Sequence, residues 1–273
     1  MKRLLFTLAL LPTLFLPVRA EDEILLPVLM YHEVRPDQPG KDSITPQELE
    51  SDLRWLSGNG YTAVTMREVI AAVYDGAPLP EKPIVLSFDD GYYNNILYLP
   101  ELLKRYDMKI VLSVIGKSAD EFSEYPSGNL HYAHATWEQL REFEESGLAE
   151  LQHHSYALHR LDAVNRGCCR QKGESGAAYE KRLSEDTLLM QQRLYDECGH
   201  TAECYVYPYG FYEPETSEVL RELGFQATLS CDFGVNRLTH DPDCLMGMKR
   251  ICRSHGAELK ALLRQGLGAA ALP

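Results

Sequence analysis

An apolar run ends in two adjacent acids and a glycine in the segment Ile84-Val85-Leu86-Ser87-Phe88-Asp89-Asp90-Gly91, and a helix-like segment follows it. Buried strands of parallel sheets are continuous apolar runs, and α/β proteins carry their chemistry at the carboxyl ends of such strands. Two acids side by side at a strand end repel each other unless a cation or a shared proton offsets the repulsion. The alternative is that Asp89 and Asp90 only cap the following helix.

Strand-like and helix-like segments alternate on both sides of this run. The strand-like segments span residues 24–31, 61–64, 84–88, 109–115, 148–152, 202–207 and 225–230. The helix-like segments span residues 45–57, 66–74, 94–105, 136–146, 179–197, 214–223 and 257–267. This alternation predicts βαβ units and a mostly parallel sheet, and roughly six or more strands in about 250 residues favour a barrel. We expect the α/β class, as a distorted (β/α) barrel with mostly parallel strands.

The first 20 residues have the pattern of an export signal. Lys2 and Arg3 precede an apolar stretch that is broken by Pro12, and Val18-Arg19-Ala20 is a suitable cleavage site. As a membrane anchor the stretch is short, because a spanning helix needs about 20 apolar residues. We expect residues 1–20 to be removed. Residues 21–273 would then form one domain that is secreted, extracellular or periplasmic, and associated with the cell envelope without stable membrane insertion.

Charge and cysteine content limit the partners. The chain carries a formal net charge of −13, with 40 acidic and 27 basic residues, which argues against nucleic acid and anionic membranes as partners. It has seven cysteines, so at least one is unpaired in the monomer that we expect. Cys198 and Cys204 flank a short turn and form the first pair to consider, although the sequence leaves the connectivity open.

Polar side chains with metal-binding potential follow several of the predicted strands. In a β/α barrel such strand ends emerge on one face, so residues far apart in the sequence can meet. A carboxylate with two imidazoles is a common ligand set for a divalent transition metal, and it leaves positions open for water and substrate. This pattern is typical of a metal-assisted hydrolase. The residues after the strands are His32, Asp89, Asp90, His153, His154, His159 and the segment 207–210.

These residues resemble the motifs of a known family. Ser87-Phe88-Asp89-Asp90-Gly91 is similar to the first motif of the polysaccharide deacetylases of carbohydrate esterase family 4, which have the NodB-homology fold. The second motif is matched by His154-Ser155-Tyr156-Ala157-Leu158-His159 and the third by Tyr207-Pro208-Tyr209-Gly210. The resemblance extends from about Leu26 to Leu267, nearly the whole chain after the signal.

The resemblance implies a reaction and a role for each residue. It makes Asp89 the general base and Asp90, His154 and His159 the ligands of a divalent metal ion, with zinc favoured and cobalt, nickel, iron or manganese compatible. The backbone N–H of Tyr209 would stabilise the oxyanion. The expected substrate is an N-acetylated glycan, a polysaccharide or oligosaccharide that contains N-acetylglucosamine, and the expected products are acetate and a free amino sugar.

The chain also departs from the common family pattern. Four residues rather than three separate the two histidines, and Val206 stands where the third motif commonly has an arginine. The late motifs that normally supply an acid histidine are not evident. The chain in this respect resembles the poly-N-acetylglucosamine deacetylase branch, in which the strand with the acid histidine comes first. We therefore expect His32, not His255, to be the general acid.

Three alternatives remain open on the sequence alone. His32 could merely hydrogen-bond a loop at its strand end. An O-acetyl esterase of the xylan type could use the same metal and base, and it would depend less on a general acid because an alcohol leaves more easily than an amine. A glycan-binding module on a catalytically decayed fold would bind sugar without binding metal.

Overall fold

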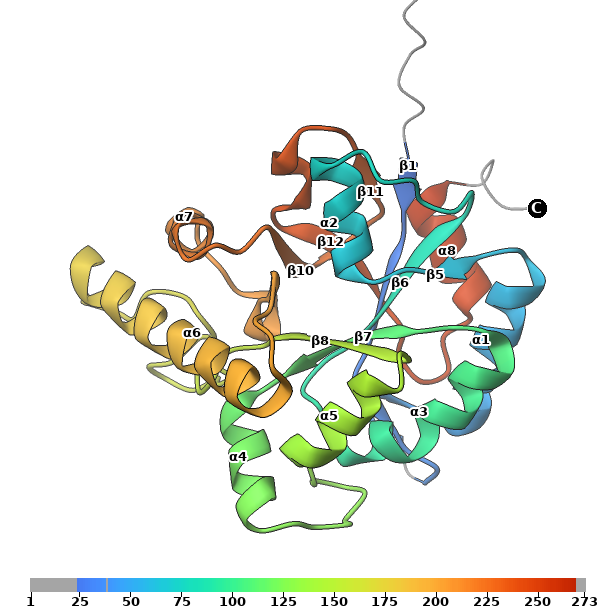
Figure 1. The fold of residues 1–273 in the computed structure, drawn as a ribbon, viewed down its shortest axis with the longest axis horizontal. Coiled ribbons are helices and arrows are strands. Elements are labelled where there is room, and N and C mark those ends of the chain that lie inside the picture. Colours follow the sequence, from blue (N-terminus) through green and yellow to red (C-terminus); the bar gives the residue numbers. More distant parts are fainter. Residues whose placement is uncertain (1–23, 38, 269–273) are drawn as a thin grey trace, which may run out of the picture.

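The computed structural model describes residues 24–37 and 39–268, which form a parallel β-barrel surrounded by helices (Figure 1). The predicted export signal lies outside the described residues. The strands are Ile24–Leu26 (β1), Val28–Tyr31 (β2), Glu33–Val34 (β3), Ser43–Ile44 (β4), Thr62–Ala63 (β5), Pro83–Phe88 (β6), Ile110–Val114 (β7), Ala149–His153 (β8), Cys204–Val206 (β9), Ala227–Phe233 (β10), Asn236–Leu238 (β11) and Met248–Cys252 (β12). The α-helices are Pro46–Gly58 (α1), Met66–Tyr74 (α2), Tyr93–Tyr106 (α3), Gly116–Glu124 (α4), Trp137–Glu145 (α5), Gly176–Cys198 (α6), Pro214–Glu222 (α7) and Leu259–Leu267 (α8).

The barrel closes through seven parallel strands in the order β2-β12-β10-β9-β8-β7-β6, and β6 pairs again with β2. The short strand β5 pairs in parallel with the start of β6, at Pro83 and Ile84, before the segment of β6 that pairs with β2. Outside the barrel, β1 pairs with β11 in antiparallel orientation and β3 pairs with β4. The predicted α/β class and the distorted barrel of mostly parallel strands are confirmed.

Alternation along the strands divides the apolar core into two layers. On β6, Ile84, Leu86 and Phe88 belong to the cluster between the barrel and its surrounding helices. Val85 belongs to a second cluster that also contains buried residues of β2, β7, β9, β10 and β12, which is the barrel interior. Because successive side chains point to opposite faces, Asp89 continues the inward series toward the carboxyl end of the barrel.

Helix α2 closes the opposite end of the barrel (Figure 1). Its apolar face, which includes Met66 and Val69, packs on the interior cluster. The buried carboxylate of Glu150 on β8 accepts hydrogen bonds from the backbone N–H groups of Met66 and Arg67, at 3.0 and 3.2 Å. A carboxylate on the amide groups of a helix N-terminus offsets the positive end of the helix dipole. Helix α2 therefore covers one end of the barrel, and the predicted site residues lie at the other, carboxyl end.

Two helix starts follow the sequence closely. Thr45 and Glu48 form a capping box at α1, as Thr136 and Gln139 do at α5. Pro100 lies inside α3, and the helix continues through it. Proline removes one backbone hydrogen bond, and the buried leucines on either side of it hold the helix to the barrel.

Several elements differ from those that the sequence predicts. Helix α4 and strand β12 were not expected, and Pro27 divides the first strand into β1 and β2. All seven cysteines are free, so the pair Cys198–Cys204 is not formed. No helix among the described residues combines the length and the apolar character that crossing a membrane requires.

Candidate active site

The carboxyl end of the barrel brings all six predicted site residues together. Parallel strands end at the same rim, so short segments after separate strands face a common space. The structure places Asp89 and Asp90 after β6, His32 after β2, His154 and His159 after β8, and Tyr209 in the short 3-10 helix η1 (Pro208–Gly210) after β9.

Asp90 lies between two imidazoles in an arrangement that fits a metal ion. Its Oδ1 atom is 3.3 Å from Nε2 of His154 and 3.3 Å from Nε2 of His159. The three candidate ligand atoms lie within 4.8 Å of one another. Asp90 Oδ1 is buried and, within the described part of the chain, has no hydrogen-bond partner. A buried, unpartnered carboxylate oxygen is costly, and a divalent cation coordinated by these three residues removes that cost.

The far side of His154 fixes its orientation. Nδ1 is 2.8 Å from the carbonyl oxygen of Val206, so Nδ1 carries the proton and Nε2 of the neutral ring offers its lone pair toward Asp90. Burial lowers the pKa of His154, but Asp90 and Asp89 outweigh burial and raise that pKa overall. Burial and repulsion from His154 lower the pKa of His159 to about 4. The two histidines thus differ, because the neighbouring carboxylates favour protonation of His154 whereas burial disfavours protonation of His159.

Asp89 and His32 form the second part of the site. Asp89 Oδ2 is 4.0 Å from Nε2 of His32, with the carboxylate almost fully buried and the imidazole 22% exposed. A carboxylate and an imidazole therefore face each other at the carboxyl end of the barrel. The carbonyl oxygen of His32 accepts a hydrogen bond from the buried side chain of Asn95 on α3 at 2.9 Å, which holds the backbone that carries the imidazole.

Arg250, in the middle of β12, is a site residue that the sequence analysis missed. Its guanidinium is fully buried; Nη1 donates to Asp89 Oδ1 at 2.8 Å and to Ser87 Oγ at 3.1 Å. Its Nε donates to the carbonyl oxygen of Ser230 at 2.7 Å. Burial would raise the pKa of Asp89, but the charge and hydrogen bond of Arg250 together with the charges of His154 and His32 outweigh burial, and the pKa of Asp89 is lowered. The available signal in the sequence was Val206, which stands where the third motif commonly has an arginine. The absence of that arginine indicates that another strand supplies the cation.

Backbone strain is concentrated at this site. Asp90, Ser155 and Tyr209 have φ values of 73°, 67° and 59°, in the left-handed region that non-glycine residues rarely adopt. Only one other described non-glycine residue has a positive φ, Asp107 at the end of α3. Strained backbone persists where the surrounding structure enforces it, and it gathers at functional sites. Each of the three residues belongs to one of the matched sequence motifs.

Tyr209 forms the rim of the site. Its ring centroid is 4.3 Å from that of His159, and the side chain is 38% exposed. The next residue, Gly210, has φ of 71°, and a Cβ atom there would lie 2.5 Å from Cβ of Cys231. Only glycine fits at this position. The absence of a side chain lets η1 pack closely against β10, and this packing fixes the position of Tyr209.

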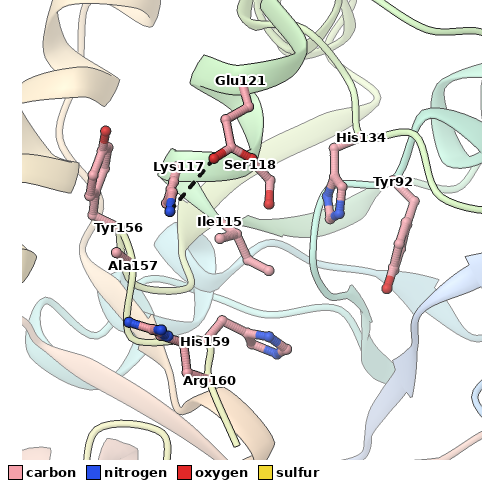
Figure 2. Close-up of a pocket in the computed structure, with 10 residues that line it drawn as sticks. All are labelled: Tyr92, Ile115, Lys117, Ser118, Glu121, His134, Tyr156, Ala157, His159 and Arg160. Carbon is pink, nitrogen blue, oxygen red and sulfur yellow. Dashed lines mark ion pairs between the residues drawn. The ribbon is translucent and has the colours of Figure 1, made fainter. Parts of the chain in front are cut away.

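Tyr92 and His134 form a neighbouring wall that the sequence analysis did not assign. Their rings stack at a centroid distance of 4.7 Å, and His134 Nδ1 is 3.0 Å from the carbonyl oxygen of Asp90. Burial lowers the pKa of His134. With His159 these residues line a pocket of about 310 Å³ (Figure 2). The aromatic residues that follow Gly91, Tyr92 and Tyr93, were the available signal in the sequence.

Other polar residues near the site have partners of their own. His255 binds the carboxylate of Glu48 at 2.9 Å, on the loop before α8. His153 is fully buried, and its Nδ1 and Nε2 contact the N–H of Ser155 and the carbonyl oxygen of Thr187. Its pKa falls to about 3 because of burial. Both histidines are therefore engaged in contacts outside the Asp89–His32 pair.

The fold and the matched motifs define a class of protein. A profile of the polysaccharide deacetylase family matches residues 76–228, more than half of the chain. The chain therefore belongs to the polysaccharide deacetylase family, whose members are hydrolases that act on acetylated glycans. The family assignment and the enzyme class predicted from the sequence are confirmed.

Individual relatives refine this placement. The chain is similar to a protein of Escherichia coli K12 named poly-beta-1,6-N-acetyl-D-glucosamine N-deacetylase, with 26% identity over 243 residues, 82% of this chain and 35% of the relative. The chain thus spans about a third of that protein's length. The solved structure of IcaB from Ammonifex degensii is 25% identical with a TM-score of 0.72 and coverage of 90% and 97%. The BpsB deacetylase domain from Bordetella bronchiseptica is 28% identical with a TM-score of 0.70 and coverage of 85% and 96%.

Proposed function

We propose that this chain is a secreted or periplasmic, metal-dependent hydrolase that removes N-acetyl groups from glycans containing N-acetylglucosamine and releases acetate. The observation that carries the proposal is the pairing of two sets of residues at one barrel rim. Asp90, His154 and His159 form a metal-ligand cluster, and Asp89 faces His32 beside it. The N-deacetylase named above supports the choice of an amide over an ester, and the pattern of residues 1–20 supports export.

The residues supply each proton transfer of an amide hydrolysis. A divalent ion, when bound, polarises the acetamide carbonyl and lowers the pKa of water at the site. Asp89, kept ionised by Arg250, takes the proton of the attacking water as the new C–O bond forms. The backbone N–H of Tyr209 donates to the developing oxyanion. His32 gives a proton to the nitrogen as the C–N bond breaks, so acetate and a free amine leave.

The test is acetate release from N-acetylglucosamine oligomers by the metal-reconstituted protein, measured beside Asp89→Asn. Release that disappears in the variant, with its metal content intact, supports deacetylation with Asp89 as base. If only a simple acetyl ester reacts, the protein is an O-acetyl esterase. If neither substrate reacts and no metal binds although the glycan does, a decayed binding module is the correct description.

A further inference from the structure

A polar pocket opens beside the metal-ligand cluster, between α4 and the loop after β8. His159 belongs to its lining, so a group bound there lies next to the reacting sugar. Figure 2 shows Tyr92 and His134 on one side of this pocket and Lys117 and Arg160 on the side away from them. The pocket therefore has an aromatic wall and a cationic wall.

The charge of the cationic wall is opposite in sign to the net charge of the whole chain. The protein carries a net charge of −13, yet the pocket lining contains two cations and a single acid, Glu121. Glu121 Oε1 lies 3.6 Å from Nζ of Lys117 and offsets that charge in part. Asp162, two residues beyond Arg160, interacts with the charge of Arg160 but does not line the pocket, and it accepts hydrogen bonds from the N–H groups of Val164 and Asn165, each at 2.8 Å. The lining thus keeps an excess of about one positive charge.

The two segments that carry these cations are held together. The N–H groups of Gly116 and Lys117, in the first turn of α4, donate to the carbonyl oxygens of Ser155 and Tyr156 at 3.1 and 2.9 Å. A Cβ atom at Gly116 would lie 2.5 Å from the sulfur of Met190 and 2.8 Å from the ring of Tyr156. Only glycine permits this close approach. The backbones of the two segments are thereby fixed relative to each other before a ligand arrives, which lowers the entropic cost of binding.

We propose that this pocket is a subsite for a carboxylate on the sugar adjacent to the N-acetylated residue. The inference rests on the proposed N-deacetylase function and names the substrate class for that site. An excess of one positive charge matches a singly charged carboxylate better than a doubly charged phosphate. Arg160 and Lys117 supply the donors, since guanidinium and ammonium groups bind carboxylates through charge-assisted hydrogen bonds. The carboxylate can belong to a uronic acid or to a lactyl ether on the sugar.

The experiment compares three oligosaccharides of equal length on the full metal-loaded protein. One has only neutral N-acetylglucosamine units, one has a uronic acid beside the acetylated unit, and one has a lactyl ether there. We expect kcat/KM to be about tenfold higher for at least one acidic substrate, with a matching difference in Kd for the metal-free protein by calorimetry. The preference should fall with rising salt, because the cations are exposed.

Variants connect the preference to the pocket. Lys117→Gln and Arg160→Gln should each lower the ratio of acidic to neutral kcat/KM several-fold. Lys181→Gln removes an exposed cation on α6 and should leave the ratio unchanged. Equal kcat/KM for all three substrates, or an equal loss of the ratio in Lys181→Gln, overturns the subsite while the deacetylase function stands. No acetate release from any substrate overturns the proposed function itself.

Discussion

At the scale of single residues, the contacts of Arg250 explain how Asp89 stays ionised inside the barrel. Both side chains are almost completely excluded from solvent, and their atoms approach to 2.8 Å. A buried carboxylate without such a partner would take up a proton and could no longer act as a base. The guanidinium also bonds Ser87 and Ser230, so its position is fixed from three sides.

Replacing Arg250 by Gln should reduce kcat about 100-fold, because a positioned general base contributes about 10²–10⁴ in rate. KM should change little, since the side chain of Arg250 is fully buried and bonded to Asp89. Arg250→Lys should restore part of the rate. Steady-state kinetics at equal metal content are the measurement.

The matched control for this prediction is Arg253→Gln. Arg253 forms a buried ion pair with Asp52 at 2.7 Å, away from the Asp89–His32 pair. Removing one partner of a buried pair costs about 3–5 kcal/mol of unfolding free energy, so both variants lose stability. A similar loss of kcat in both would show that Arg250 acts only through folding.

Replacing His32 by Asn should abolish turnover of the amide substrate without changing the bound metal. The expected loss exceeds 100-fold, because an amine leaves poorly without a proton donor. Acetate release and metal analysis on the same sample test both parts. Loss of metal from the variant, or full activity, would remove His32 from the role of general acid.

The residues that the sequence predicted are those with a local signature. Asp89, Asp90, His154 and His159 stand in motifs of adjacent residues, and the barrel rim collects them. Arg250 has no local signature, because a cation in a short strand gives no indication of the acid that it will meet. Its partner lies 161 residues away in the chain, and the pairing of strands around the barrel brings the two together.

At the scale of elements, Glu48 joins helix α1 to the loop before α8. It completes the capping box with Thr45 and accepts a hydrogen bond from the N–H of Gly256 at 2.8 Å. Burial opposes the ionisation of Glu48, but the bonds from Thr45 and Gly256 outweigh burial and lower its pKa to about 2. One carboxylate thus holds a helix start and a distant loop.

Glu48→Gln should lower the free energy of unfolding by about 1 kcal/mol at neutral pH. The folded-state pKa of about 2 is below the ordinary value of 4.5. The contribution of Glu48 is therefore complete above pH 4.5 and is lost as the pH falls toward 2. Urea denaturation from pH 7 to pH 3 should show a shallower acid loss in the variant than in the wild-type chain.

Glu68→Gln is the control at the element scale. Glu68 completes the capping box of α2 with Thr65 but contacts Lys109 rather than the loop before α8. Both variants should lose helix capping. If hydrogen exchange in residues 254–258 increases equally in the two variants, the link from Glu48 to that loop does not contribute.

Helices and strands were predictable from the sequence where a capping signal and the spacing of apolar residues indicate the same boundaries. The boundaries of α2 and the capping boxes of α1 and α5 follow from such signals. Strand β12 was not predictable in this way, because Lys249 and Arg250 interrupt its apolar run. Arg250 can be buried there only because the ion pair inside the barrel compensates its charge.

At the scale of the whole molecule, removing the metal should lower both activity and stability. An ion bound at 100 times its Kd stabilises the folded state by about 2.7 kcal/mol. For a chain of this size that corresponds to a fall in Tm of about 5–10 °C on chelation. Calorimetry with and without chelator measures the shift, and Asp90→Asn should not show it. Unchanged Tm and activity after chelation would contradict the metal assignment.

The order of strands around the barrel has a consequence for protein synthesis. β2 is the first barrel strand to leave the ribosome and β12 is the last, yet the two are neighbours in the closed ring. A chain that stops before residue 248 cannot complete the ring, and its Asp89 has no guanidinium to face. Such a chain lacks both strand β12 and the cation that pairs with Asp89. At the proposed site, Asp89 and Arg250 can therefore meet only after the last barrel strand has been translated.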